Sequence, residues 1–313
     1  MATLAEIDVL ENALRRKGQL LDILLIDRTT KKNITWGTDS YLHYGKDFAP
    51  QKHMSPDLVT GVYGTLIQPR AAKSLAEQRQ RTKDKAEVFT PLRIVDQMNK
   101  LIDWSGDIRL PDEASWQDYV RELKLEISCG EAPFIVSRYN PTAHTGKLIR
   151  LESRVGFLDR KLRVVSKYCH QPNTWLLWAR AAYQASYGYE WQGDNLLIAR
   201  ENLLYSLIDY YLAKFGERPS VAVQQEFAEI ISWNIWQMDG LKYVLPMSCR
   251  HKTQITPGEL TLFGESPDIV ERYECEGCKF GRPAKHNGKY AKTMDWTNGK
   301  PLRFIDARLK NQH

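Results

Sequence analysis

The chain has 313 residues and a formal net charge of +6, with 42% hydrophobic, 26% charged and 11% aromatic residues. This composition is typical of a globular protein with one large core or two smaller ones. The longest apolar stretch, residues 20–26, is much shorter than the roughly 20 residues of a membrane-spanning helix, so we expect no membrane partner. The first residues lack the basic start and apolar centre of a secretory signal, which predicts a cytoplasmic protein. Five cysteines in such a chain favour thiols or metal ligands over disulfides.

The positive charge is concentrated in two blocks. Residues 70–85 have a net charge of +4 and residues 272–313 of +6, which leaves about −4 for the rest of the chain. Two such blocks indicate a surface that binds a polyanion. Two solvated faces would give the same pattern, so both interpretations stay open.

The first 80 residues predict an α+β module. Apolar residues at spacings of three and four predict an amphipathic helix over residues 3–17. Residues 20–28, 33–45 and 58–70 are rich in β-branched and aromatic residues with Gly, Asn and Asp breaks, as in short strands joined by turns.

The next segment, residues 81–246, predicts an α/β core. A helix is expected over 92–103 and a buried strand over 123–128. Strands that alternate with helices of ten or more residues form parallel sheets, and this pattern continues with a helix at 175–186, a strand at 187–190, and helices at 195–215 and 221–235. After Pro246 the composition changes to Cys, His, Gly and Lys, which predicts a small third module over 247–313.

Four segments of this core carry candidate cofactor-binding residues. Phe89, Thr90 and Pro91 precede the first helix. The strand at 123–128 runs into a small-residue turn, where backbone amides can approach a ligand at the carboxyl edge of a parallel sheet. Candidates in and around that turn are Glu126, Ser128, Cys129, Gly130 and Phe134. Glu190 ends the second strand, where an acid can accept hydrogen bonds from two ribose hydroxyls. Asp239 lies in residues 232–242, where a third strand is expected.

In this order the segments resemble those of S-adenosylmethionine-dependent DNA adenine-N6 methyltransferases, in particular the modification subunits of restriction systems. The resemblance covers roughly residues 85–245 and implies a Rossmann-like methyltransferase sheet with helices on both faces. It implies that Phe89, Thr90 and Pro91 close over the methionine end of S-adenosylmethionine and that Glu126 and Gly130 belong to the cofactor loop. It further implies that Glu190 binds the ribose and Asp239 the adenine. For each acid alone, a helix cap or a surface charge is the simpler interpretation.

The chain also departs from the family pattern. Ile127 replaces the proline of the cofactor loop, and residues 131–133 replace its second glycine. The Pro-Pro-aromatic catalytic motif, which holds a flipped base and its amine, is absent from the 313 residues, and Asn234-Ile-Trp236 is a poor substitute. The catalytic residue is therefore unknown, and a second subunit that completes the active site is one expected partner.

Residues 139–175 are rich in Arg and Lys, with interspersed aromatic residues and His, and lengthen the connection between the first two strands. We interpret them as a basic insertion at the ligand-facing edge that contacts phosphates. The alternative is a helical lid that packs against the core.

The third module predicts a structural zinc site. Cys275 and Cys278 form a C-x2-C pair, and Cys249 lies upstream beside His251. Two short-spaced pairs provide the four Cys or His ligands of tetrahedral zinc, with either His251 or His286 as the fourth. The alternative is a set of buried thiols.

The leading hypothesis is a protein that binds S-adenosylmethionine and zinc and acts on DNA, with RNA not excluded. It would methylate adenine-N6 or modify a base in a related way, in a restriction-modification or phage-defence context. The alternative is a non-catalytic nucleic-acid-binding or regulatory subunit that keeps the methyltransferase fold. Whether the chain is an enzyme stays open, with methyl transfer favoured.

Overall fold

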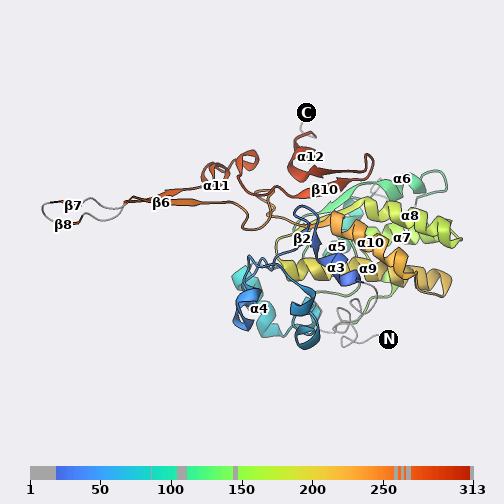
Figure 1. The fold of residues 1–313 in the computed structure, drawn as a ribbon. Coiled ribbons are helices and arrows are strands. Elements are labelled where there is room, and N and C mark those ends of the chain that lie inside the picture. Colours follow the sequence, from blue (N-terminus) through green and yellow to red (C-terminus); the bar gives the residue numbers. More distant parts are fainter. Residues whose placement is uncertain are drawn as a thin grey trace.

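The computed structural model describes residues 19–85, 87–103, 111–143, 147–256, 260–261, 264–265 and 269–310. A body of helices surrounds a small sheet, and a thin two-stranded arm extends from it (Figure 1). The helix expected at residues 3–17 lies outside the described residues.

A three-stranded parallel sheet lies at the centre of the body, with the order β3-β4-β5. The strands are β3 (Lys124–Glu126), β4 (Ser186–Glu190) and β5 (Ile235–Gln237). Glu126 pairs with Gly188, and Glu190 pairs with Gln237. The expected strands and their parallel pairing are confirmed, so the fold is a mixed α/β arrangement. The carboxyl ends of β3 and β4 meet at one edge, where the cofactor segments were expected.

Four helices connect and cover these strands: α7 (Phe157–Tyr168), α8 (Pro172–Gln184), α9 (Gly193–Phe215) and α10 (Val221–Asn234). The helix α9 is buried along most of its length, as expected for a helix that is apolar on several sides. It ends at Gly216, whose φ of 77° is the left-handed conformation of a helix C-cap. The hydroxyl of Ser220 caps α10 by accepting from the Val223 amide.

The C-terminal residues cover part of one face of the sheet. They form a hairpin of β10 (Lys292–Asp295) and β11 (Lys300–Arg303), followed by α12 (Phe304–Lys310). The rings of Trp236 on β5 and Phe304 lie 5.0 Å apart. The hydroxyl of Tyr187 on β4 donates to the Met294 carbonyl at 3.2 Å. This segment therefore belongs to the body of the protein.

The N-terminal segment differs from the expectation. Residues 20–28 begin as the helix α3 (Leu20–Leu25) and only then form a two-residue strand, β1 (Ile26–Asp27), paired with β2 (Lys32–Asn33). The strand expectation for residues 20–25 is wrong because four leucines of α3 are buried against the core at helical spacing. The segments expected as strands at 33–45 and 58–70 are mainly 3-10 turns: Leu42–Tyr44, Lys46–Phe48, Pro56–Leu58, Gly61–Tyr63 and Arg70–Ala72. One hydrophobic core joins these residues to the α/β segment.

Three further helices precede β3, the first strand of the sheet. They are α4 (Leu75–Lys85), α5 (Leu92–Leu101) and α6 (Trp116–Arg121). The expected helix after Pro91 is thus confirmed as α5. The described structure also contains the short 3-10 turns Leu151–Ser153 and Pro283–Lys285.

The basic segment at 139–175 packs into the core. It contains α7, whose apolar residues are buried. Arg154 pairs with Asp209 at 2.7 Å, and Arg160 pairs with Asp103 at 2.7 Å. These guanidinium groups are turned towards acids of the same chain, so they are not part of a phosphate-binding surface. The packed helical alternative describes this segment better.

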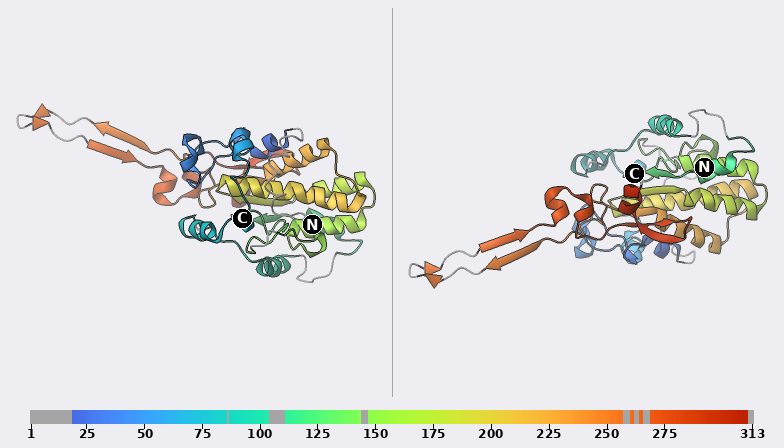
Figure 2. Two further views of the ribbon diagram at one scale, coloured as in Figure 1. Left: turned by 90° about the horizontal axis from the view of Figure 1, so that it is seen from below. Right: turned by 90° about the horizontal axis from the view of Figure 1, so that it is seen from above.

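The arm consists of β6 (Lys252–Thr256) and β9 (Ile269–Tyr273), with β7 (Leu260–Thr261) and β8 (Gly264–Glu265) paired further out. All five residues of β6 are exposed. Two further views show the arm extending away from the helical body, with the short helix α11 (Glu276–Phe280) at its root (Figure 2). Among the helices that the structure describes, none combines the length and the apolar character needed to cross a membrane.

Candidate functional site

A cavity of about 660 Å³ opens at the carboxyl ends of β3 and β4, and we call it the main cavity. Its volume lies in the usual range of roughly 300–1,000 Å³ for small-molecule sites. Three of the predicted segments meet in its walls, which include Phe89, Thr90, Glu126, Ser128, Cys129, Gly130, Phe134 and Glu190. Pro91 is not among the lining residues; it begins the helix α5 beside the cavity.

The loop after β3 has an unusual backbone. Ser128, Gly130 and Ala132 have φ angles of 48°, 54° and 62°, so three alternate residues adopt the left-handed conformation. For Ser and Ala this conformation costs about 1 kcal/mol each relative to glycine. The Cys129 amide donates to the Tyr189 carbonyl at 2.8 Å and thereby fixes the loop to the end of β4. Such strain concentrates at binding sites.

Two buried carboxylates hold this loop in place. Glu126 accepts hydrogen bonds from the amides of Phe134 and Ile135, at 3.3 and 3.2 Å. Glu190 accepts from the amides of Gly130 at 2.8 Å and Gln192 at 3.1 Å. Burial raises the pKa of both carboxyls, most strongly that of Glu126. Both acids line the main cavity, and each keeps lone pairs available for a ligand.

The ring of Phe89 packs against this loop and also lines the main cavity. A Cβ atom at Gly130 would lie 3.3 Å from two atoms of this ring, so the loop and the ring are in close contact. The guanidinium of Arg70 lies 4.9 Å from the centre of the same ring. Arg70 also donates to Thr82 and Glu87, so a cation–π contact and hydrogen bonds together fix the position of Phe89.

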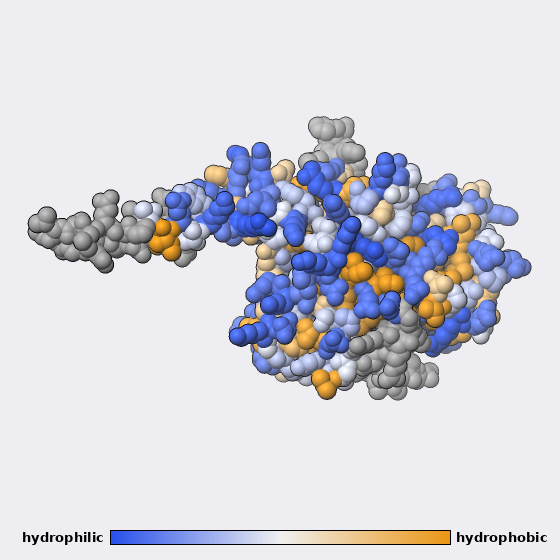
Figure 3. Space-filling model, in the orientation of Figure 1, coloured by the Kyte–Doolittle hydropathy of each residue, from blue (hydrophilic) through white to orange (hydrophobic). Residues whose placement is uncertain are grey.

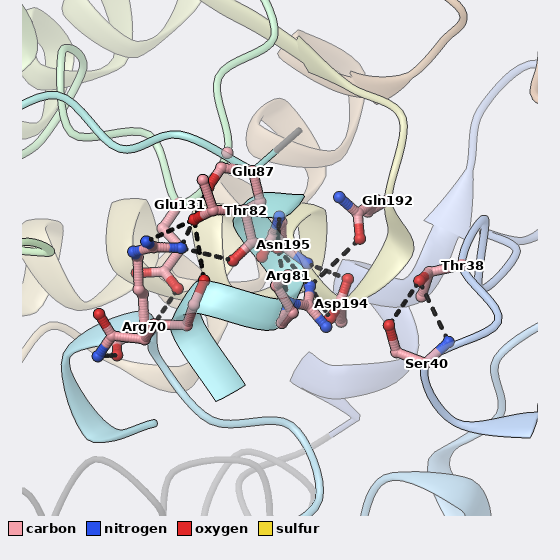
Figure 4. Close-up of polar contacts among 12 residues, drawn as sticks. Thr38, Ser40, Arg70, Arg81, Thr82, Glu87, Glu131, Gln192, Asp194 and Asn195 are labelled. Carbon is pink, nitrogen blue, oxygen red and sulfur yellow. Dashed lines mark hydrogen bonds and ion pairs between the residues drawn. The ribbon is translucent and has the colours of Figure 1, made fainter. Parts of the chain in front are cut away.

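Arg70 and Glu87 belong to a buried network that sequence reasoning missed (Figure 4). Arg81 of α4 donates to Glu87 at 2.7 Å and to Asp194 of α9 at 2.8 Å. Tyr41 donates to the same carboxylate of Asp194 at 2.8 Å. Glu87, Gln192 and Asn195 of this network border the main cavity. The net charge of residues 70–85 suggested a surface, whereas Arg81 is buried.

The charge of the main cavity is distinctive. Within the described part of the chain, its lining includes three glutamates, Glu87, Glu126 and Glu190, and neither lysine nor arginine. A polyphosphate ligand would bring several negative charges next to these acids, which is unfavourable. The cavity is therefore suited to a neutral or cationic ligand.

Asp239 lies outside the main cavity, in a neighbouring cleft of about 320 Å³ that we call the Asp239 cleft. Its carboxylate accepts from the amides of Leu241 and Lys242 at 2.9 and 3.1 Å, so it also caps its own turn. Trp191, directly after Glu190, lines both the cleft and the main cavity. The two spaces therefore adjoin across this tryptophan.

A second site lies at the root of the arm. Cys249, Cys275, Cys278 and His286 place their ligand atoms within 4.8 Å of one another, close enough to hold a metal ion. The Nδ1 atom of His286 lies 3.5 Å from the sulfur of Cys249 and 3.6 Å from each of the other two sulfurs. Tetrahedral zinc, with bonds of about 2.3 Å to sulfur and about 2.0 Å to nitrogen, separates these atoms by about 3.5 Å.

The surroundings of this Cys/His cluster also fit a metal ion. The amide of Asn287 donates to the Cys275 sulfur at 3.2 Å, and the hydroxyl of Tyr290 accepts from the His286 amide at 2.9 Å. Burial opposes ionisation of Cys275, but backbone amides and the His286 ring lower its pKa to about 6. Burial and the neighbouring thiols raise the pKa of Cys249 to about 12. Three adjacent thiols cannot all ionise without a cation, which a metal ion would supply.

The sequence left either His251 or His286 as the fourth ligand. In the structure His286 belongs to the cluster and His251 does not. His251 is exposed and lines the Asp239 cleft. Gly277 is required here because a Cβ at this position would lie 2.6 Å from the His286 ring. Cys129 and Cys169 are buried elsewhere as free thiols.

Comparison with protein-family models, with curated proteins and with solved structures found no match to the chain. The fold and the two sites described above are therefore the basis for any functional conclusion.

Proposed function

We propose that the protein binds S-adenosylmethionine in the main cavity and acts on a nucleic acid base, by adenine-N6 methylation or a related modification, in a restriction-modification or phage-defence context. The observation that carries this proposal is the convergence of three separate segments on one cavity. Residues 89–90, 126–130, 133–134 and 190 come from segments that are far apart in sequence, yet all of them line it.

The dimensions of the site suit a nucleoside with a long substituent. Glu190 lies where an acid can accept hydrogen bonds from ribose hydroxyls. Beyond it, Trp191 offers an aromatic surface and Asp239 an acceptor for an exocyclic amine, while Phe89 lies against the loop at 128–130 in the wall of the main cavity. The adenine would therefore lie towards the Asp239 cleft and the amino-acid end towards Phe89.

The charge of the cavity favours this ligand over other nucleotides. S-adenosylmethionine carries a sulfonium and an ammonium group and has no phosphate. Glu87 is already paired with Arg70 and Arg81, so Glu126 and Glu190 are the acids that can attract such a cation. A dinucleotide or a nucleoside triphosphate instead requires cationic partners or backbone nests for its phosphates.

The test is calorimetric titration of the protein with S-adenosylmethionine, with ATP as the comparison ligand. We expect saturable binding of the first and none of the second. Glu190→Ala should abolish binding, whereas Glu152→Ala, which changes an exposed acid of the ion pair with Arg150, is the matched control and should bind normally. Absence of binding by the wild-type protein at high micromolar concentration would contradict the proposal.

The nucleic acid would bind near the root of the arm. Exposed cationic residues gather around the Cys/His cluster, and Figure 3 shows a largely hydrophilic surface there. These residues are Arg250, Lys252, Lys279, Arg282, Lys285, Lys289 and Lys292. Such a surface suits the phosphate backbone, with structural zinc in the cluster keeping the cationic side chains in place.

The alternative function is a non-catalytic nucleic-acid-binding or regulatory subunit, and the absence of a Pro-Pro-aromatic motif favours it. Incubation of DNA and of RNA with S-adenosylmethionine labelled on the methyl group distinguishes the two functions. Label in adenine excludes the alternative. Cofactor binding without label in any base supports it, or indicates that a further subunit is required.

A further inference from the structure

The edge strand β3 has one unpaired side. It pairs with β4, and no strand formed by the described residues pairs with its other side. The Lys124 amide donates to the Ala185 carbonyl, which precedes β4, at 3.0 Å. Because backbone groups alternate in direction along a strand, the N–H and C=O of Leu125 point away from β4. These are the groups to which a further strand would bind.

One face of β3 is apolar and exposed. Leu123, Leu125 and Ile127 have exposed fractions of 74%, 39% and 68%. Leu125 pairs in register with Tyr187, so the two side chains project from the same face of the sheet. On β4 and β5 this face is covered by the C-terminal segment, through the contacts of Tyr187 with Met294 and of Trp236 with Phe304. The cover ends before it reaches β3.

Natural edge strands are usually protected from pairing by outward-pointing charges, proline or bulges. In β3 the arrangement is reversed. Lys124 is buried and pairs with Asp103 at 2.9 Å, and Glu126 is turned towards the loop that follows the strand. The charged residues therefore face inwards, and the apolar residues face outwards. The apolar surface continues onto α5, where Leu101 and Ile102, at the mouth of the main cavity, are 82% and 53% exposed.

We propose that a partner polypeptide adds a β-strand to the free side of β3 and covers Leu123, Leu125 and Ile127 with apolar side chains. The outward N–H and C=O of Leu125 favour an extended strand as the occupant, because a paired strand supplies an acceptor and a donor to the same residue. Leu125 and Ile127 are also lining residues of the main cavity, so the added strand would complete the wall of the cavity on this side. Residues at one end of the added strand would therefore reach the mouth of the cavity.

The role of this partner rests on the proposed function: the partner would supply groups that hold or activate the substrate, for which this chain has no assigned residue. The docking itself does not depend on cofactor binding. The two proposals can therefore fail separately.

The experiment places a photo-crosslinking amino acid at position 123 of the full chain, expressed in its own cells. The matched control has the same amino acid at position 177, because Leu177 on α8 is also well exposed, at 56%. Neither position lines the main cavity. We expect a different polypeptide to be crosslinked at position 123 and not at 177, through a segment with apolar residues at alternate positions.

The purified complex then tests the strand pairing. Hydrogen exchange at the Leu125 amide should slow in the complex, and Leu123→Lys should reduce partner affinity at least tenfold, whereas Leu177→Lys should not. A circular dichroism spectrum and a thermal unfolding midpoint like those of the wild type show that the Leu123→Lys variant is folded, whether or not the protein binds S-adenosylmethionine. The proposal is overturned by crosslinking only to nucleic acid, only to a second copy of this chain, or no more at 123 than at 177. An unprotected Leu125 amide in the complex also overturns it.

Discussion

The substitution Gly130→Ala tests whether the loop after β3 is a wall of the ligand site. Gly130 has a φ of 54°, in the region that favours glycine. An alanine there costs about 1 kcal/mol in backbone strain. Its Cβ would also lie 3.3 Å from the Cε1 and Cζ atoms of Phe89, so the ring must move by a few tenths of an ångström. We expect the free energy of unfolding to fall by about 1–2 kcal/mol.

The matched control is Gly216→Ala. Gly216 ends α9 with a φ of 77°, and no atom lies within 4 Å of a Cβ built there. Its substitution therefore carries a similar backbone cost without displacing a neighbouring side chain. A comparison of the two variants separates the displacement of Phe89 from a general loss of stability.

The assays are urea denaturation for stability and calorimetry for S-adenosylmethionine binding. Both variants should lose comparable stability, but only Gly130→Ala should lose affinity. We expect a loss of about tenfold, which corresponds to about 1.4 kcal/mol, because the ring and the loop border the same space. If Gly130→Ala binds the cofactor as tightly as Gly216→Ala does, Phe89 and this loop do not contact the ligand, and the assignment of the site is wrong.

Three further predictions concern the metal, the pH dependence and the core. Cys278→Ser should lower bound zinc, measured by elemental analysis, from about one ion per chain to well below half, whereas Cys169→Ser should not change it; equal zinc in both variants would exclude the cluster as the site. Burial raises the pKa of Glu190, so this carboxyl ionises less readily in the folded protein than in the unfolded chain. The free energy of unfolding of the unliganded wild type therefore falls as the pH rises above the ordinary carboxyl pKa. The stability deficit of Glu190→Gln relative to wild type should therefore shrink between about pH 4 and pH 8 in thermal unfolding, and a constant deficit would contradict the raised pKa. Arg200→Ala should lower the free energy of unfolding by about 3 kcal/mol or more in urea denaturation, because this buried guanidinium donates to the backbone carbonyls of α3, α10 and both strands β1 and β5; a loss below about 1 kcal/mol would contradict this.

The parallel core could be predicted from the sequence because its elements are long or clearly periodic. The helices α9 and α10 and the strand β4 lie close to their expected positions. The segment at 20–25 was assigned to the wrong element because a short run of leucines has no clear period. Only tertiary contacts, in which α3 packs against α9 and α10, select the helix.

The metal cluster was predictable in part. The C-x2-C pair at Cys275 and Cys278 identified half of the site, and Cys249 followed as the nearest upstream cysteine. The sequence could not choose between His251 and His286, because the choice depends on the path of the arm. Cys249 lies just before β6 and Cys275 just after β9, so the pairing of these two strands brings the cysteines together at the root. His286 then approaches from the segment after α11.

The sequence was least able to predict which arginine and lysine side chains are exposed and which are buried. A count of arginines and lysines assumes that each is solvated, yet a guanidinium with a carboxylate partner can be buried inside a domain. Arg81 and Arg154 are both about 95–97% buried and pair with Asp194 and Asp209. The basic block at 70–85 and the insertion at 139–175 therefore contribute less surface charge than their sequences indicate. The exposed lysines around the Cys/His cluster keep theirs, and this surface at the root of the arm is the one that we propose for nucleic acid.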